Sequence, residues 1–189
     1  MDVNKELLKI KDEIIACQKC SLCKERKNPV IGQGSHQAKI IFIGEAPGAK
    51  EDETGVPFCG RSGKFLSELL SLVGIEREDV YICNIVKCRP PKNRDPKESE
   101  INECKNYLER QIELINPKII CSLGRYSMNF MMNYLGLSES IQPISKIHGQ
   151  IFERGRLFVP FYHPAVAIYN SNMKEALKKD FEILKKYVD

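Results

Sequence analysis

The amino-acid sequence predicts an α/β protein with a mostly parallel sheet that is covered by helices on both faces. Short apolar runs alternate along the chain with longer segments whose apolar residues recur at helical spacing, a pattern typical of βαβ units. Continuously apolar runs are typical of strands that are buried on both faces. The 189 residues contain no repeat, low-complexity tract or linker, and they favour a single domain over residues 1–189 with a sizeable core.

The first elements follow from apolar spacing and from a stop signal. Residues 5–16 place apolar side chains three and four positions apart and are expected to form a helix. Residues 39–43, Lys-Ile-Ile-Phe-Ile, are expected to form a buried strand. Residues 62–73 repeat the helical spacing, and Gly74 marks the end of that helix.

The middle of the chain continues the alternation. A second strand is expected over residues 80–86 and a third over 118–123. Between them, residues 90–96 are expected to form a loop, because a Pro-Pro pair and Asn-Arg-Asp continue neither a helix nor a strand. A helix over residues 99–115 is expected to end before Pro117.

The last third is expected to add two helices and a hairpin. Residues 125–135 are expected to form a Met-rich helix, and the apolar runs 151–152 and 157–161 flank a Glu-Arg-Gly-Arg turn. Residues 172–188 are expected to form the final helix, with Asn172 as its N-cap.

Composition and charge limit the classes of function. A net charge of +4 permits a nucleic-acid partner without demanding one. No apolar run approaches the roughly 20 residues that span a bilayer, and the N-terminal residues do not resemble a signal peptide. The expected location is the cytoplasm, where disulfides are rare. The eight cysteines are therefore expected to bind a metal, to bind a cluster, or to be buried as thiols.

Four cysteines have a spacing that suits a metal or cluster site. Cys17 and Cys20 form a Cys-x2-Cys pair after the first helix, and Cys88 and Cys104 flank the proline-rich loop. Such a set suits a 4Fe–4S cluster or a structural zinc ion. Cys23 extends the pair toward the bacterial ferredoxin run, whose fourth cysteine is missing, so Cys23 is either a spare thiol or a competitor for one position. The remaining cysteines fit buried thiols: Cys59, Cys83 and Cys121.

Four residues have side chains suited to binding or catalysis. Glu45 stands in the turn Gly-Glu-Ala-Pro-Gly, residues 44–48, and open α/β sheets bind ligands at that edge. The donor and acceptor of the Asn84 amide together match a pyrimidine edge, or they satisfy a structural role. His163 is a candidate electrophile or general acid, or a histidine that is simply hydrogen-bonded. Phe58 is either a core residue or a stacking platform.

Residues 55–62 nearly match a phosphate-binding P-loop. Arg61 stands where that loop requires lysine, and an acidic segment precedes it instead of a strand. The chain is therefore not expected to bind a nucleotide triphosphate.

Several motifs follow one another in order from Cys17 almost to the C-terminus. They are Cys17-x2-Cys20-x-Leu22-x3-Arg26, Gly44-Glu45-Ala46-Pro47-Gly48 with Glu51-Asp52, Gly55-Val56-Pro57-Phe58-x-Gly60-Arg61-x-Gly63, Asn84-Ile85-Val86-Lys87-Cys88-Arg89-Pro90-Pro91 with Asn93-Arg94-Asp95-Pro96, Cys104, and Tyr162-His163-Pro164-Ala165. Each is modest alone, but the ordered set is highly specific and resembles the family 4 uracil-DNA glycosylases, the iron–sulfur branch of that superfamily. The resemblance implies a three-layer α/β/α sandwich with a central, mostly parallel four-stranded sheet.

The resemblance implies one 4Fe–4S cluster, held by Cys17, Cys20, Cys88 and Cys104, with Cys23 as a spare thiol. The cluster is expected to be structural and to join the N-terminal segment to the loop that precedes the helix at residue 99. That loop would then present four basic side chains to DNA phosphates. They are Lys87, Arg89, Lys92 and Arg94.

The resemblance also implies a reaction on uracil in single- or double-stranded DNA. The uridine leaves the helix before its N-glycosidic bond is hydrolysed, so free uracil and an abasic site are the products. Uracil is expected to stack on Phe58, while Asn84 binds O4 and N3 and thereby excludes cytosine. Glu51 is expected to crowd C5 and to exclude thymine. The turn after the first strand supplies the rest of the pocket, namely Gly44, Glu45 and Ala46.

Two residues are expected to act in bond cleavage. His163 donates a hydrogen bond to uracil O2, where negative charge develops, and such a donor is worth roughly 3–4 kcal/mol by comparison with oxyanion holes. Glu45 orients or activates water, or offsets cationic charge on the sugar. The best-known branch of the superfamily carries an Asp where this chain has Ala46, so the acid is displaced by one position. An apolar wedge that fills the vacated stack is expected among Val166, Ala167 and Ile168.

Two alternative functions stand beside this one. A branch that binds uracil-DNA covalently carries a histidine-bearing basic loop, and residues 87–96 contain no histidine. A catalytically inactive DNA-binding module of the same fold would be expected to lose Glu45, Asn84 or His163, and all three are present. The sequence therefore favours a monofunctional uracil-DNA glycosylase of base excision repair, acting as a nucleoid-associated monomer without a membrane partner.

Overall fold

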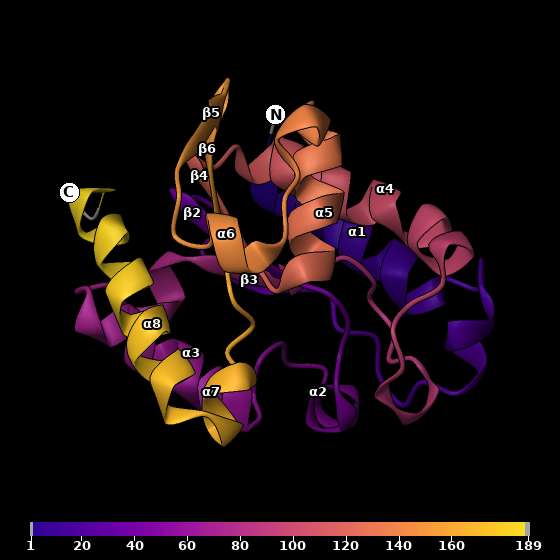
Figure 1. Cartoon of the computed structure of the whole chain (residues 1–189). Coiled ribbons are helices and arrows are strands. Elements are labelled where there is room, and N and C mark those ends of the chain that lie inside the picture. Colours follow the sequence, from indigo (N-terminus) through magenta and orange to yellow (C-terminus); the bar gives the residue numbers. More distant parts are fainter. Residues whose placement is uncertain (1, 188–189) are drawn as a thin grey trace.

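The computed structural model describes residues 2–187 and builds them around one six-stranded sheet (Figure 1). The strand order is β1-β3-β2-β4-β6-β5. The four central strands are parallel, and each edge strand is antiparallel to its neighbour. The strands are β1 (Gln33–Gly34), β2 (Ile40–Gly44), β3 (Tyr81–Asn84), β4 (Ile119–Leu123), β5 (Phe152–Arg154) and β6 (Arg156–Phe161).

Helices occupy both faces of the sheet and its carboxyl edge. The α-helices are α1 (Val3–Ala16), α2 (Ala49–Thr54), α3 (Arg61–Leu72), α4 (Glu98–Ile115), α5 (Arg125–Tyr134), α6 (Ile144–Ile147), α7 (Val166–Tyr169) and α8 (Ser171–Phe181). Short 3-10 helices are formed by Ser21–Lys24, Arg77–Asp79, Pro91–Asn93, Ser138–Ser140 and Glu182–Tyr187. Within residues 2–187, no helix has the length and apolar character needed to cross a membrane.

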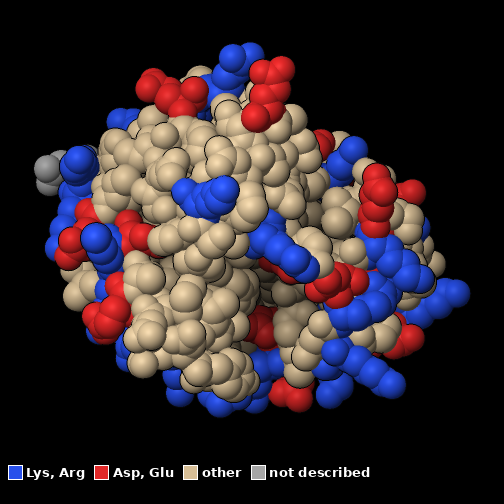
Figure 2. Space-filling view, viewed as in Figure 1, with Lys and Arg blue, Asp and Glu red and all other residues tan. Residues whose placement is uncertain are grey.

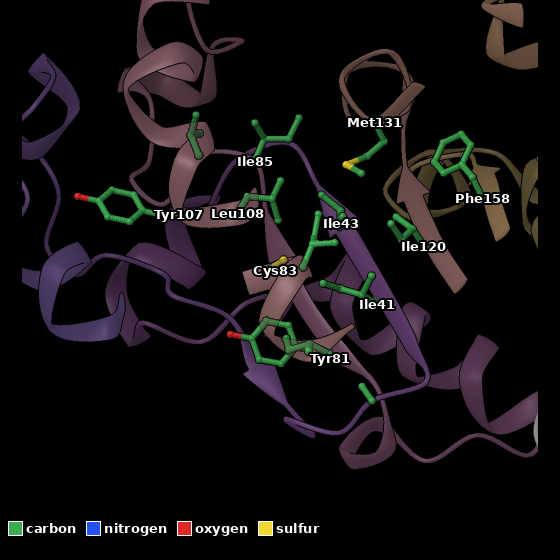
Figure 3. Packing of buried hydrophobic residues seen from close by; sticks show 14 of the residues in the cluster. Ile41, Ile43, Tyr81, Cys83, Ile85, Tyr107, Leu108, Ile120, Met131 and Phe158 are labelled. Atoms are coloured by element: carbon green, nitrogen blue, oxygen red, sulfur yellow. The ribbon is translucent and has the colours of Figure 1, made fainter. Parts of the chain in front are cut away.

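Alternation along β2 divides the core into two layers. Ile41 and Ile43 join one cluster with buried residues of α1, α4 and α5, part of which Figure 3 shows. Ile40 and Phe42 join the opposite cluster with buried residues of α3 and α8. Both faces of β2 are thus covered, as its continuous apolar run predicts. The predicted three-layer α/β/α class is confirmed.

The predicted number of four strands is wrong, because the sheet has six. The four parallel strands match the expected centre, and the hairpin that adds β5 was itself expected. The sixth strand, β1, is only two residues long, and one of them is a glycine. So short a polar strand carries no apolar periodicity, and it is found only by its pairing with β3.

The C-terminal helix differs from the prediction at both ends. Asn170, not Asn172, is the N-cap, and its side-chain oxygen accepts hydrogen bonds from the backbone N–H groups of Asn172 and Met173 at 3.0 and 3.4 Å. The α-helix ends at Phe181 and continues as a 3-10 helix to Tyr187. The predicted end at Val188 lies outside the described residues.

The strand register gathers the candidate residues at one edge of the sheet. Gly44, the last residue of β2, pairs with Asn84, the last residue of β3. Leu123 of β4 pairs in the same way with Phe161 of β6, two residues before His163. The helices α2 and α7, which follow β2 and β6, both lie at the lower side of Figure 1. Turns far apart in the sequence therefore meet beyond the carboxyl ends of the strands.

Candidate active site

A pocket of about 450 Å³ opens at this carboxyl edge. The molecule is visibly hollowed on this side, and Lys and Arg side chains gather beside the hollow (Figure 2). Six of the predicted uracil-binding residues line the pocket: Glu45, Ala46, Glu51, Phe58, Asn84 and His163. Residues that sequence reasoning did not assign to it also line it: Pro47, Gly48, Ser62, Pro90, Asn93, Asp95 and Ala165, together with Arg94, which was expected only as a phosphate contact.

Gly44 lets Phe58 and Asn84, which both line the pocket, approach the end of β2 closely. A Cβ at position 44 would lie 2.3 Å from Asn84 Oδ1 and 2.8 Å from Phe58 Cζ. Real Cβ contacts are longer than that, so only glycine lets the ring and the amide approach the strand end this closely. Gly44 therefore serves the pocket by its lack of a side chain.

Phe58 adopts a strained backbone conformation that the fold holds in place. Its φ of 48° lies in the left-handed region, which costs a residue other than glycine about 1–3 kcal/mol. Gly63 packs against it so closely that a Cβ there would lie 1.6 Å from Phe58 O. Arg77 Nη2 donates a hydrogen bond to the preceding Pro57 carbonyl at 2.6 Å. The ring is thereby fixed over the pocket, 5.6 Å from the His163 ring centroid.

Asn84 presents an unused hydrogen-bond acceptor. The residue is 2% exposed, and its Oδ1 has no hydrogen-bond partner in the structure. A buried amide oxygen without a donor costs about 1–3 kcal/mol, so such an atom marks a place where a ligand donor is expected. The amide lines the pocket together with Phe58, and both residues approach Gly44.

The imidazole of His163 is neutral and oriented. Burial lowers its pKa to about 4, because the charged form loses solvation. Its Nδ1 accepts a hydrogen bond from the Ala165 N–H at 3.1 Å, which places the ring proton on Nε2. His163 therefore offers one N–H donor on the ring edge away from Ala165. Gly124 makes room for it, since a Cβ there would approach the His163 Cβ to 3.2 Å.

The carboxyl group of Glu45 has a pKa close to neutral pH. Its pKa is raised to about 7, mainly because burial disfavours the charged form and further because Asp95 is negative, while Arg125 opposes the shift. Asp95 is held by a hydrogen bond from the Tyr126 hydroxyl, which in turn accepts one from Arg125 at 2.8 Å. Sequence reasoning missed Asp95, because an Asp before proline in a polar loop has the ordinary features of a turn residue.

Glu51 faces the pocket from α2, which is anchored to the N-terminal segment. The buried carboxylate of Asp52 accepts a hydrogen bond from the Lys27 N–H at 3.0 Å. Gly48 leaves room for the Glu51 carboxylate, because a Cβ at position 48 would lie 2.8 Å from Glu51 Oε2.

Three of the four predicted phosphate contacts lie on the loop that borders the pocket. Arg94 forms a two-pronged ion pair with Glu100, at 2.7 and 2.9 Å, and is one of the pocket-lining residues. Arg89 donates a hydrogen bond to Asn93 Oδ1 at 2.7 Å, and Lys92 is exposed.

The fourth, Lys87, contradicts its prediction. Its side chain is 1% exposed, and its Nζ donates hydrogen bonds to the Asn84 carbonyl at 2.9 Å and to Gln111 Oε1 at 2.7 Å. A side chain held in this way is directed inward and is not available to a DNA phosphate. Lys87 was grouped with the basic residues that follow it in the sequence, but the backbone directs its side chain into the core.

The predicted wedge segment forms the short helix α7 at the pocket rim. Val166 and Ala167 pack partly against the core cluster of α3 and α8. Ile168 is not part of that cluster, and the adjacent Tyr169 is 80% exposed. The choice of wedge residue stays a prediction.

The predicted cluster ligands surround a second, small cavity. Within residues 2–187 no group of three or more Cys, His, Asp or Glu side chains is arranged to hold a single metal ion. The thiols instead stand around a common space, next to Lys87 and Arg26. The cysteines that line it are Cys17, Cys20, Cys23, Cys88 and Cys104.

The chemistry of this cavity fits an iron–sulfur cluster better than zinc. Zinc requires four ligands within about 2.3 Å of one point, whereas each thiolate of a cluster binds a different iron of a larger cage. Arg26 Nη1 donates to Cys88 Sγ at 3.0 Å, and the Lys87 N–H donates to Cys104 Sγ at 3.3 Å. Hydrogen bonds to sulfur are the outer contacts that cluster ligands require. Of the other cysteines, Cys83 and Cys121 are buried as predicted, whereas Cys59 is only half-buried, so its prediction as a buried thiol is wrong.

Comparisons with known proteins agree with this geometry. Residues 31–185 match the uracil DNA glycosylase superfamily. The chain is 46% identical over 182 residues to a type-4 uracil-DNA glycosylase of Sulfurisphaera tokodaii, covering 93% of this chain and 82% of the relative. It is 47% identical over 182 residues to the type-4 enzyme of Saccharolobus solfataricus, covering 93% and 83%. In fold, it resembles the solution NMR structure of a Methanosarcina acetivorans protein provisionally assigned as a uracil DNA glycosylase, with a TM-score of 0.55, 14% identity, and coverage of 84% and 98%.

Proposed function

The chain belongs to the uracil-DNA glycosylase superfamily and groups with its type-4 members, and from this premise we propose how its pocket selects uracil and cleaves the glycosidic bond. The enzyme excises uracil from DNA and acts in repair. The observation that carries the proposed recognition is the buried, unpartnered Oδ1 of Asn84.

Asn84 reads the uracil edge. Its Oδ1 accepts the N3–H of uracil and its Nδ2 donates to O4, which completes the hydrogen bonds of a buried amide. Cytosine offers an acceptor at N3 and a donor at C4, so both contacts would become repulsive. Phe58 stacks on the base, and Glu51 lies near C5, where the methyl group of thymine would meet it.

His163 and Glu45 act on the bond that breaks. The Nε2–H of neutral His163 donates to O2 as negative charge develops there, and a neutral donor avoids the cost of a buried cation. Glu45, with a pKa of about 7, holds the attacking water and takes up its proton. The uridine reaches this site only after it has left the base stack.

A 4Fe–4S cluster is proposed at the cysteine cavity, with Cys17, Cys20, Cys88 and Cys104 as ligands and Cys23 as the spare thiol. A bound cluster would have a structural role, because its ligands come from the segment after α1, the segment after β3, and α4. The loop of Arg89, Lys92 and Arg94 is then held beside the pocket to receive phosphates. We also propose that the protein is a monomer and that it acts on cellular DNA in the cytoplasm.

A uracil-containing oligonucleotide tests the function. The protein, purified without oxygen, is expected to convert it to an alkali-labile abasic site in buffer without added metal, and to be brown with absorbance near 400 nm. An oligonucleotide with cytosine at the same position is the matched control. Asn84→Asp is expected to lose selectivity and rate, because a carboxylate cannot donate to O4.

The same assay separates the inactive alternative. A binding module would retain the uracil oligonucleotide without releasing uracil, and a covalent binder would leave a complex stable to denaturation. If free uracil is released and the protein dissociates from the DNA, both the inactive binding module and the covalent binder are excluded.

A further inference from the structure

Lys87 is the only lysine side chain that is buried among residues 2–187. It stands between the two sites of the molecule. Its Nζ holds the carbonyl of Asn84, the base-reading residue, and its backbone N–H donates to the sulfur of Cys104. The next residue in the chain is Cys88, and Lys87 itself lines the cysteine cavity.

The ammonium group of Lys87 has neutral partners only. Its two acceptors are a backbone carbonyl and the amide oxygen of Gln111. In the described part of the chain, no carboxylate lies within ion-pair distance of it. A buried charge without a counter-charge is costly, and natural proteins pair such groups. The buried ammonium of Lys87 therefore favours a negatively charged group beside it.

The cysteine cavity is where that negative charge belongs. Cysteine ligands bind a cluster as thiolates, so four of them place net negative charge next to Lys87. Charge and hydrogen bonds around a cluster set its reduction potential. Arg26 lines the same cavity and contributes through its hydrogen bond to Cys88.

We propose that Lys87 is a positioning residue that couples the cysteine site to base recognition, with its buried ammonium as counter-charge to the cluster and as the clamp on the Asn84 carbonyl. Gln111 completes the clamp, since its Nε2 donates to the Ile31 carbonyl at 3.0 Å and to the Tyr81 hydroxyl at 3.1 Å. The cluster thereby stabilises the conformation in which Asn84 reads uracil. The inference rests on the proposed function and extends it.

The test compares Lys87→Met with Lys105→Met in the cluster-loaded protein. Lys105 neighbours Cys104 in α4 but is not buried, so its charge is screened by water. Two readouts are taken: the reduction potential of the cluster and the affinity for free uracil by titration calorimetry. Lys87→Met is expected to favour the oxidised cluster at least tenfold, about 59 mV for a one-electron couple, and to weaken uracil binding at least tenfold. Lys105→Met is expected to change each less than threefold.

Equality of the two variants in either readout overturns the inference. Should Lys87→Met not fold, the wild-type protein is titrated with uracil before and after removal of iron by a chelator. A tenfold loss of affinity is expected, and unchanged affinity overturns the coupling. If the wild-type protein contains no iron, the proposed cluster and this inference are both refuted. If the wild type contains iron and is active, but Lys87→Met changes neither the reduction potential nor the affinity for uracil, only this inference is refuted.

Discussion

Replacing Gly44 with alanine tests the geometry of the pocket most directly. The new Cβ would lie 2.3 Å from Asn84 Oδ1, whereas an ordinary contact begins at 3.4 Å, so the amide must retreat by about 1 Å. Phe58 must also move, since its Cζ would be 2.8 Å away. A misplacement of about 1 Å at a reacting site costs on the order of 100-fold in rate. Gly44→Ala is therefore expected to lower uracil excision about 100-fold.

Single-turnover excision of uracil from an oligonucleotide measures the effect, and circular dichroism with a thermal melt checks the fold. Gly60→Ala is the matched control, because its Cβ would meet neighbours only at 3.8 Å and its φ is negative. That variant is expected to stay within threefold of wild type. A Gly44→Ala protein that is equally active would refute the claim that the ring and the amide must touch the strand end.

Further expectations concern ionisation, cleavage and base choice. Excision should rise with pH through about 7 as Glu45 ionises, and Asp95→Asn should shift this limb to lower pH, because a negative neighbour that favours the neutral acid is removed; an unshifted pH–rate profile would contradict the pairing. His163→Ala should reduce excision by about 10²–10³-fold with little change in DNA affinity, measured by fluorescence anisotropy, and equal losses would refute a role in the transition state. No limb from His163 is expected between pH 5 and 8, since its pKa is about 4. Asn84→Asp should narrow the preference for uracil over cytosine in competition, and retained selectivity would exclude the edge contact.

The features that could be predicted from sequence are those with a local cause. The run Ile40–Gly44 is apolar at every position before its glycine, and such a run is buried on both faces wherever it lies. The Gly-Glu-Ala-Pro-Gly turn cannot continue the strand, so the acid necessarily follows the strand end. Boundaries were less certain, as the cap at Asn170 shows: two asparagines two residues apart have the same capping chemistry, and only the backbone decides between them.

The features that could not be predicted depend on partners far away in the sequence. Lys87 lies in a basic segment, and its burial depends on Gln111, 24 positions later, and on a cavity formed by three chain segments. Asp95 acts on Glu45 across the pocket, which no spacing along the chain reveals. The unsatisfied Oδ1 of Asn84 is likewise a property of what surrounds the amide.

The sequence by itself determined the parallel centre of the sheet, the carboxyl edge where the pocket lies, and six of the residues that line that pocket. Hydrophobic periodicity and backbone stereochemistry depend on residues that are close together in the chain, so their patterns can be recognised in the sequence. Only the tertiary structure decided the electrostatics: which acid is held near neutrality, which histidine nitrogen carries the proton, and which lysine turns inward. Burial and charge pairing depend on distances through space, and those distances exist only after the chain has folded.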